Sequence, residues 1–186
     1  VFDLFMCFLL LPTTVAIMLV LLILNPFFNK GPVFYTQIRM GKDCRAFRAY
    51  KFRSMLPAGE GARSVEDGIE EDRITPLGKL MRKSRCDELP QIFNVIKGEM
   101  SMIGPRPDTF SHARQFVRTI PEYRQRHSVR PGISGLAQVS LGYAVGTEAT
   151  RAKALMDLQY IRTAGFKTDT KLVFQTIQTV LARAGA

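Results

Sequence analysis

The chain opens with a run of 24 residues, Val1 to Leu24, that is apolar except for Asp3 and the step Pro12-Thr13-Thr14. An α-helix rises about 1.5 Å per residue, so this run would extend over roughly 36 Å as a straight helix. The hydrocarbon core of a bilayer is about 30 Å thick. Length and composition therefore predict a membrane-embedded helix, with the rest of the chain folding beside the membrane.

Pro12 lies near the middle of this segment and leaves two membrane arrangements open. Proline removes a backbone hydrogen bond and kinks a helix, and the hydroxyls of Thr13 and Thr14 can satisfy carbonyls that the kink frees. The residues alone are compatible both with a full span and with a re-entrant helix bent at Pro12. Because a charge is costly in hydrocarbon, we expect Asp3 at headgroup level, with any cationic partner on the same side.

Charge separates this segment from the rest of the chain. Lys and Arg total 26 against 16 Asp and Glu, for a net charge of +10. Basic residues crowd residues 30–53, which by the positive-inside tendency places the body of the protein on the cytoplasmic side, beside anionic lipid headgroups. Such a charge predicts anionic partners, namely nucleic acid, phospholipids or a phosphorylated substrate. No recognised nucleic-acid-binding motif is present, so we expect no nucleic acid partner.

The remaining pattern predicts an α+β, mainly α-helical chain. Aromatic residues with partial alternation between Gly31 and Met55, interrupted by a turn at 40–43, predict a small β-hairpin. Residues 57–72 are polar and glycine-rich, which is typical of a loop. Apolar spacing and capping residues predict four helices. They begin at Thr75-Pro76 and Asp87 and extend over 150–162 and 169–183. The expected domains are therefore a membrane helix, 1–25, and one cytosolic, membrane-associated domain, 26–186.

The last two predicted helices are amphipathic. Their apolar stripes are Leu155, Leu158 and Ile161 in one helix, and Leu172, Val173, Ile177, Val180 and Leu181 in the other. Packing against the core is the usual role of such stripes. Phe166, Lys167 and Lys171, at the start of the last helix, instead suit a membrane interface.

Two adjacent carboxylates, Asp87 and Glu88, come directly after a basic stretch that contains Arg82 and Arg85. One interpretation is structural: Asp87 is a helix N-cap and Glu88 complements the helix dipole. The other is chemical. Nearby cations should lower the pKa of Asp87, and an ionised carboxylate can attack phosphorus when cations neutralise the phosphate. The pair can also hold Mg²⁺ together with phosphate oxygens.

Further cations point to the same chemistry. Arg106 lies between Pro105 and Pro107, so a rigid loop should hold its guanidinium ready for a bidentate phosphate contact. Lys51 and Arg53 are two apart on a predicted strand and would share a face, where they could hold anionic oxygens together. A solvated basic edge strand remains the alternative for this pair.

Six motifs occur in a recognisable order along the chain. They are Tyr50 to Met55, Asp72 to Gly78, Asp87 to Gln91, Lys97 to Ser101, Gly104 to Pro107 and Arg130 to Gln138. With them the chain resembles, over essentially its whole length, the bacterial sugar transferases, the monotopic phosphoglycosyl transferases that begin glycan assembly on a polyprenol carrier.

The resemblance implies a reaction and its residues. The expected activity is transfer of a sugar 1-phosphate from a UDP-sugar to polyprenyl phosphate, commonly undecaprenyl phosphate, with release of UMP and with Mg²⁺ as cofactor. Asp87 maps onto the nucleophile and Glu88 onto its partner, and both are expected metal ligands. The residues expected at the phosphates are Lys51, Arg82, Arg106 and Arg53, and those expected at the nucleotide are Arg130 and Gln138.

The resemblance also implies a location. Residues 1–25 are expected to form a re-entrant helix that enters one leaflet and bends at Pro12, among membrane lipids. The catalytic domain, 26–186, would then lie on the cytoplasmic face of the bacterial inner membrane. The exopolysaccharide-initiating members are the most similar in the stretch Ser140 to Tyr143 and at the C-terminal end, a weak pointer to galactose or glucose. Whether the protein is a homo-oligomer stays open.

Two positions depart from the family pattern: Cys86 stands where leucine is usual, and Ser134 where threonine is common. Neither touches a residue with an expected catalytic role, and we expect Cys86 to serve packing. The chain also begins without the basic residues that often precede Asp3 in the family, which suggests a fragment boundary. The alternative function is a non-catalytic, basic membrane scaffold, which would leave Asp87 and Glu88 unused.

Overall fold

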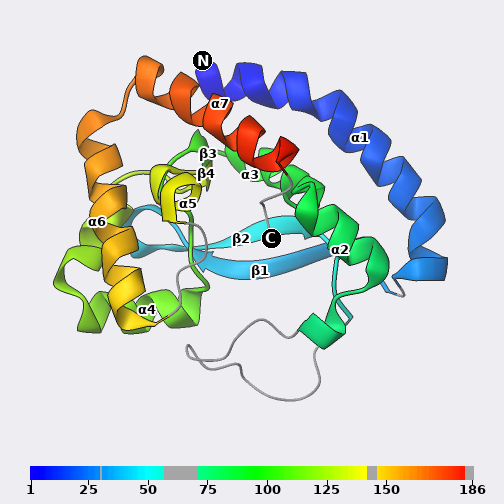
Figure 1. Cartoon of the computed structure of the whole chain (residues 1–186), viewed down its shortest axis with the longest axis horizontal. Coiled ribbons are helices and arrows are strands. Elements are labelled where there is room, and N and C mark those ends of the chain that lie inside the picture. Colours follow the sequence, from blue (N-terminus) through cyan, green and yellow to red (C-terminus); the bar gives the residue numbers. More distant parts are fainter. Residues whose placement is uncertain (30, 57–70, 142–145, 183–186) are drawn as a thin grey trace.

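The computed structural model describes residues 1–29, 31–56, 71–141 and 146–182. Within these ranges the chain is mainly helical, with two two-stranded sheets. Figure 1 shows helix α1 (Phe2–Phe28) curving along one side of the molecule, with α7 (Phe166–Leu181) beside its N-terminal part and the larger sheet below both. Most of the predicted loop at 57–72 and Arg183, the expected end of the last helix, lie outside the described residues.

The predicted β-hairpin is confirmed. Strands β1 (Phe34–Met40) and β2 (Ala46–Phe52) pair antiparallel, from Phe34 opposite Phe52 to Met40 opposite Ala46. The turn contains a short 3-10 helix, η1 (Lys42–Cys44), in which Asp43 and Cys44 take positive φ angles of 56° and 58°. Strand β2 of this hairpin packs against the segment that carries Asp87 and Glu88.

Helix α1 is continuous across Pro12 and ends at Phe28, beyond the expected boundary at residue 25. The hydroxyl of Thr14 donates to the carbonyl of Leu10 at 2.9 Å. It does not satisfy the Phe8 carbonyl, which is the one that faces the nitrogen of Pro12 in an α-helix. The helix is long and apolar enough to cross a membrane, and only 17% of its most apolar window is buried. Its exposed side chains include Leu4, Phe5, Phe8, Leu19, Ile23 and Phe27.

Both ends of α1 are tied to the same body. Near its start, a carboxylate oxygen of Asp3 accepts hydrogen bonds from the hydroxyl of Ser101 and the amide of Met102, each at 3.0 Å. At its end, Asn29 donates through its side-chain nitrogen to the Arg53 carbonyl at 2.6 Å. The partners of Asp3 among the described residues are thus neutral donors of a strand and not a cation.

The other elements are short segments. They are η2 (Glu71–Arg73), α2 (Pro76–Lys83), η3 (Cys86–Gln91), α3 (Ile92–Ile96), β3 (Ser101–Ile103), α4 (Phe110–Thr119), η4 (Pro121–Ser128), β4 (Gly132–Ser134), α5 (Leu136–Leu141) and α6 (Thr147–Thr163). Strands β3 and β4 form a second, parallel pair. The Thr75 cap is confirmed, since its hydroxyl accepts from the Gly78 amide at 2.9 Å.

Several predicted helix details are wrong. Asp87 is not an N-cap: it lies inside η3, whose N-cap position is Arg85. In the helix expected from Asp87, the apolar spacing of Leu89, Ile92, Phe93 and Ile96 predicts one buried stripe. Ile92 is buried, and so is Val95, whereas Phe93 and Ile96 are 38% and 51% exposed. The segment begins as a 3-10 helix, and its 3.0-residue turn shifts the face that a 3.6-residue period would bury.

The predicted face of α6 is right only in part, since Ile161 packs on the core and Leu158 is half-buried. Leu155 is 49% exposed, whereas Ala154, Asp157 and Tyr160 face the interior. A charged residue occupies this interior face because an arginine of η4 pairs with it. In α7, Leu172 is buried as expected, but Ile177 and Leu181 are 48% and 76% exposed.

Asn94, in α3, fixes the position of the carboxylate segment over the hairpin. Its side-chain oxygen accepts from the Tyr50 amide at 3.0 Å, and its nitrogen donates to the Arg48 carbonyl at 2.8 Å. The fully buried side-chain amide of Asn94 therefore pairs with the backbone of β2 as a neighbouring strand would. As a result, Lys51 on β2 lies opposite Glu88 on η3.

Candidate active site

Glu88 lies at the centre of a cluster of cations from three parts of the chain. Lys51 contributes its ammonium at 2.7 Å from Oε1, and Arg106 grips both oxygens, with Nη1 at 2.8 Å from Oε2 and Nη2 on Oε1. Arg85 adds a longer contact of 3.8 Å. Burial alone would raise the pKa of Glu88, but the charges of Arg106 and Lys51 hold it well below its ordinary value. Glu88 is therefore ionised, and it holds the side chains of Lys51 and Arg106 in place.

Asp87 has the opposite environment. It is only 7% exposed, and among the described residues no hydrogen-bond donor or ion-pair partner engages its carboxylate. Burial raises the pKa of Asp87, and the charge of Lys51 opposes this only in part. The predicted lowering of this pKa is wrong, because the nearest cations are committed to Glu88. The outcome is a buried carboxylate with its oxygens free to react.

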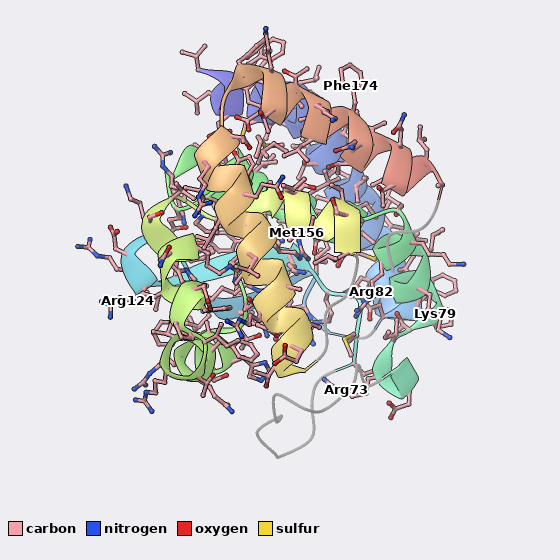
Figure 2. All side chains as sticks on the ribbon, turned by 60° about the vertical axis from the view of Figure 1, so that its left-hand side comes forward. Arg73, Lys79, Arg82, Arg124, Met156 and Phe174 are labelled. Atoms are coloured by element: carbon pink, nitrogen blue, oxygen red, sulfur yellow. The ribbon has the colours of Figure 1, made fainter. Side chains whose placement is uncertain are left out.

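Arg82 and Arg85 approach the pair from the other side. The charge of Arg82 acts on Asp87, and its Nη1 lies 3.3 Å from the sulfur of Met55. Figure 2 shows Arg82 on the inner side of α2, whereas Lys79 of the same helix projects outward. Arg85 has a left-handed backbone, with φ of 53°, and its guanidinium faces the side-chain amide of Gln138, whose oxygen accepts from it when the amide is turned to match the donor. Non-glycine residues in this conformation are uncommon and cluster at functional sites.

Close backbone contacts hold the segment that carries Arg106. The Gly104 amide donates to the Ser134 carbonyl at 2.9 Å, and Arg106 Nη1 donates to the Ile133 carbonyl at 3.1 Å. A side chain at Gly132 would put its Cβ 2.1 Å from the Gly104 nitrogen, so only glycine permits this approach. The motifs around residues 104 and 132 thus meet in space and present Arg106 to Glu88.

Some of the predicted site residues lie elsewhere. Arg53 lies just past the end of β2, and its Nε donates to the Pro32 carbonyl at 2.9 Å, so its expected place beside Lys51 is not found. Arg130 is exposed. Gln138 reaches the site only through Arg85. Of the cations expected at the phosphates, the structure therefore brings together Lys51, Arg82 and Arg106.

Cys86 fits the packing role that the sequence indicated. Its sulfur donates to the Met81 carbonyl at 3.6 Å and lies 3.1 Å from the hydroxyl of Ser84. Burial raises the pKa of the thiol, which keeps it protonated. The side chain packs on a small core cluster that includes Phe52 and Met81.

Sequence reasoning missed Arg39 and a buried group of charges behind Arg106. The charge of Arg39 lowers the pKa of Lys51, after the larger effect of burial, so the two side chains are close. The buried group contains Arg126 and Asp157, both 1% exposed at their side chains. The apolar periodicity of a helix could not predict that Asp157 is buried, because its partner Arg126 comes from a distant segment.

The donor set is of a kind that suits Mg²⁺. Among the residues that the structure describes, no group of three or more His, Cys, Asp or Glu side chains is close enough to hold a metal. Mg²⁺ needs only one or two carboxylates when substrate phosphates supply other oxygens. Asp87 has no competing donor among the described residues, so its chemistry fits the ion, whereas both oxygens of Glu88 are already engaged by Lys51 and Arg106.

Comparison with known proteins gives a consistent result. Residues 1–183 match the family described as bacterial sugar transferase. A UDP-N-acetylgalactosamine-undecaprenyl-phosphate N-acetylgalactosaminephosphotransferase of Aeromonas hydrophila is 48% identical over 178 residues, which are 95% of this chain and 42% of that protein. A UDP-glucose:undecaprenyl-phosphate glucose-1-phosphate transferase of Klebsiella pneumoniae is 39% identical, over 80% of this chain and 32% of its own length.

A third relative is matched over most of its own length. The exopolysaccharide production protein PSS of Rhizobium leguminosarum bv. phaseoli is 37% identical, over 83% of this chain and 80% of its own. The chain thus spans less than half the length of the Aeromonas and Klebsiella relatives. All three matches cover at least four fifths of this chain.

Proposed function

The chain belongs to the bacterial sugar transferase family, and we propose that it transfers a sugar 1-phosphate from a UDP-sugar to polyprenyl phosphate with Asp87 as nucleophile. The observation that carries this proposal is the contrast between the two carboxylates. Glu88 is engaged by Lys51 and Arg106, whereas Asp87 is buried beside these cations with no donor on it among the described residues. A nucleophile needs such an unengaged oxygen.

In the first step, a carboxylate oxygen of Asp87 attacks the β-phosphorus of the UDP-sugar. The bond from this phosphorus to the bridging oxygen breaks, and its electron pair leaves with UMP. The products are UMP and a phosphosugar-aspartyl enzyme. Lys51, Arg82 and Arg106 neutralise the phosphate charge that would otherwise repel the carboxylate.

In the second step, an oxygen of polyprenyl phosphate attacks the same phosphorus. The bond to Asp87 breaks, the carboxylate is restored, and a lipid-linked sugar diphosphate forms. Each step exchanges one acyl or phosphoric anhydride for another, so the protein mainly supplies position and charge. When bound at Asp87, beside Glu88, Mg²⁺ would supply further charge neutralisation at the phosphates.

We further propose that α1 is re-entrant and does not cross the membrane. Its first turn is bonded to Ser101 and Met102, and its last residues are bonded to the hairpin. A spanning helix would separate these two ends by the bilayer, so contacts of both ends with one body support a helix that enters and leaves one face. The bend at Pro12 is part of this proposal.

Helix α7 would lie at the same membrane surface. Phe2 of α1 and Phe166 of α7 make an edge-to-face contact with ring centroids 6.1 Å apart. The exposed side of α7 mixes apolar and basic side chains, among them Phe174, which Figure 2 shows projecting from the helix, and Lys171. Such a surface suits the headgroup region of anionic lipids. The proposed location is the cytoplasmic face of the bacterial inner membrane.

Cysteine labelling tests this topology. Val1→Cys and Phe28→Cys place a thiol at each exposed end of α1. In sealed inside-out vesicles, we expect a membrane-impermeant maleimide to label both, as it labels a cysteine at the exposed Arg124, because a re-entrant helix keeps both ends on the cytoplasmic side. The parent protein gives the background from its native cysteines. Labelling of one end only, with the other reached after permeabilisation, would establish a span instead.

Release of UMP tests the reaction. Detergent-solubilised protein with Mg²⁺ and undecaprenyl phosphate is given a panel of UDP-sugars that includes N-acetylgalactosamine, glucose and galactose, sugars that the relatives' names contain. We expect lipid-dependent UMP release with one or a few donors. If folded, membrane-bound protein releases no UMP from any donor, the transferase proposal fails for UDP-sugars and the scaffold alternative gains support.

A further inference from the structure

The segment that carries Arg106 is held along its length by four successive backbone carbonyls. The Pro105 carbonyl accepts from the Gly132 amide at 3.1 Å, and the Asp108 carbonyl from the Met40 amide at 3.2 Å. The two carbonyls between them, those of Arg106 and Pro107, accept hydrogen bonds from arginine side chains. Arg126 donates to the Arg106 carbonyl at 2.7 Å, and Arg39 donates to the Pro107 carbonyl at 2.5 Å.

Arg126 engages four groups through its three side-chain nitrogens. Nε and Nη2 bind Asp157 at 2.8 and 2.7 Å, and Nη1 binds Asp108 at 2.6 Å and the hydroxyl of Tyr123 at 3.0 Å. The second hydrogen of Nη2 remains for the Arg106 carbonyl. An arginine whose three nitrogens are all engaged in a fixed plane is more rigid than a lysine in the same place.

The charge of Arg126 is balanced, which permits its burial. Its side chain is 1% exposed, as is that of Asp157. With Asp108 and Lys153 the group has two positive and two negative formal charges. The Lys153 ammonium lies 2.6 Å from a carboxylate oxygen of Asp108. Burial would raise the pKa of Asp108, but Lys153 and Arg126 hold it well below its ordinary value. The formal charges of the group therefore cancel, and among the described residues it makes no hydrogen bond or ion pair with Asp87 or Glu88.

Arg39 holds the segment from the opposite side. Its Nη2 also donates to the side chain of Gln37 at 2.8 Å, and Gln37 in turn donates to the hydroxyl of Thr109 at 3.3 Å. These contacts bind the end of β1 to the residues directly after Arg106. The two arginines thus fix consecutive carbonyls by side chains that come from η4 and β1.

We propose that Arg126 and Arg39 are positioning residues for the reaction, which hold the backbone of Arg106 so that its guanidinium is fixed before substrate binds. The inference rests on the proposed function in one respect, namely that Arg106 binds phosphate. A group fixed in advance loses less freedom on binding and needs no reorganisation as charge develops. The buried charges behind the site therefore serve its geometry.

A double-mutant cycle tests this. Arg126→Lys keeps the charge but has too few donors for both aspartates, the tyrosine and the carbonyl. We expect kcat/KM for UMP release to fall by about 10- to 100-fold in the wild-type background, as for a displaced catalytic group. In an Arg106→Ala background, measured by single turnover, the same change should cost less than about 3-fold. Equal losses in both backgrounds would show a general structural effect and overturn the inference. Arg151→Lys, at an exposed ion pair with Glu122, is the matched control and should change nothing.

Hydrogen exchange gives a readout that does not require activity. In Arg126→Lys, and independently in Arg39→Lys, the backbone amides whose hydrogen bonds tie this segment to its neighbours, those of Met40, Gly104 and Gly132, should exchange faster than in the wild type, while those of α2 keep their rates. Unchanged exchange at Met40, Gly104 and Gly132 in both folded variants contradicts the proposal. If the wild type releases no UMP, the proposed function fails, and the exchange result still decides whether these arginines hold the segment.

Discussion

Replacing Asp87 with Asn is expected to abolish lipid-dependent UMP release, with a loss in kcat of at least about 10³-fold. The amide has no anionic oxygen to attack phosphorus, while its size and shape are those of the carboxylate. Lys51, Arg106 and Glu88 keep their mutual contacts, since none of them is bonded to Asp87. Activity is measured as UMP release with Mg²⁺ and undecaprenyl phosphate from the best donor of the panel.

The same substitution should leave the fold intact or stabilise it. Burial raises the pKa of Asp87, so its charged form is disfavoured in the folded protein, and a neutral amide escapes that cost. We expect a thermal midpoint at or above that of the wild type. An Asp87→Asn protein that keeps wild-type activity would remove Asp87 from the mechanism, and a phenotype unchanged in cells would favour the scaffold alternative.

Replacing Glu88 with Gln is expected to damage both activity and stability. Two partly buried cations, Lys51 and Arg106, lose their counter-charge; breaking a fully buried ion pair costs about 3–5 kcal/mol, and solvent at these side chains places the expected loss below that range. Arg106 also loses its bidentate partner and with it a defined position, so kcat should fall by at least about 10²-fold. Urea unfolding and UMP release measure the two effects on one preparation.

Asp87→Asn is the matched control for this second substitution. Both changes neutralise one carboxylate at neighbouring positions, but only Glu88 is paired with cations. We therefore expect the stability loss in Glu88→Gln alone. Equal unfolding midpoints for the two variants would mean that the cation cluster does not depend on Glu88 as its geometry indicates.

Local signals in the sequence predicted a good part of the fold. The hairpin turn at 40–43, the Thr75 cap with Pro76 and the apolar N-terminal helix each depend on residues close in sequence, and all three are confirmed. The carboxylate pair, Lys51, Arg82 and Arg106 were also recognised, partly from their chemistry and partly from the family resemblance. The structure brings these side chains together.

The remainder depends on packing that the sequence does not display. The pKa of Asp87 was expected to fall because cations are near it in sequence, but burial and the commitment of cations to Glu88 reverse the direction. The buried face of α6 carries Asp157, which is explained only by Arg126 from a segment 31 residues earlier. Arg53 was placed by strand alternation, but β2 ends one residue before it.

The central claim is that Asp87 becomes covalently phosphorylated by the sugar phosphate, and intact-protein mass spectrometry tests it most directly. Protein incubated with Mg²⁺ and its UDP-sugar, without lipid acceptor, should gain the mass of one sugar phosphate less water, located by peptide mapping on Asp87. Undecaprenyl phosphate should remove this adduct, and Asp87→Asn should never form it. If active protein releases UMP only with lipid present and carries no adduct under single-turnover conditions, the transfer is direct and the aspartyl intermediate is contradicted.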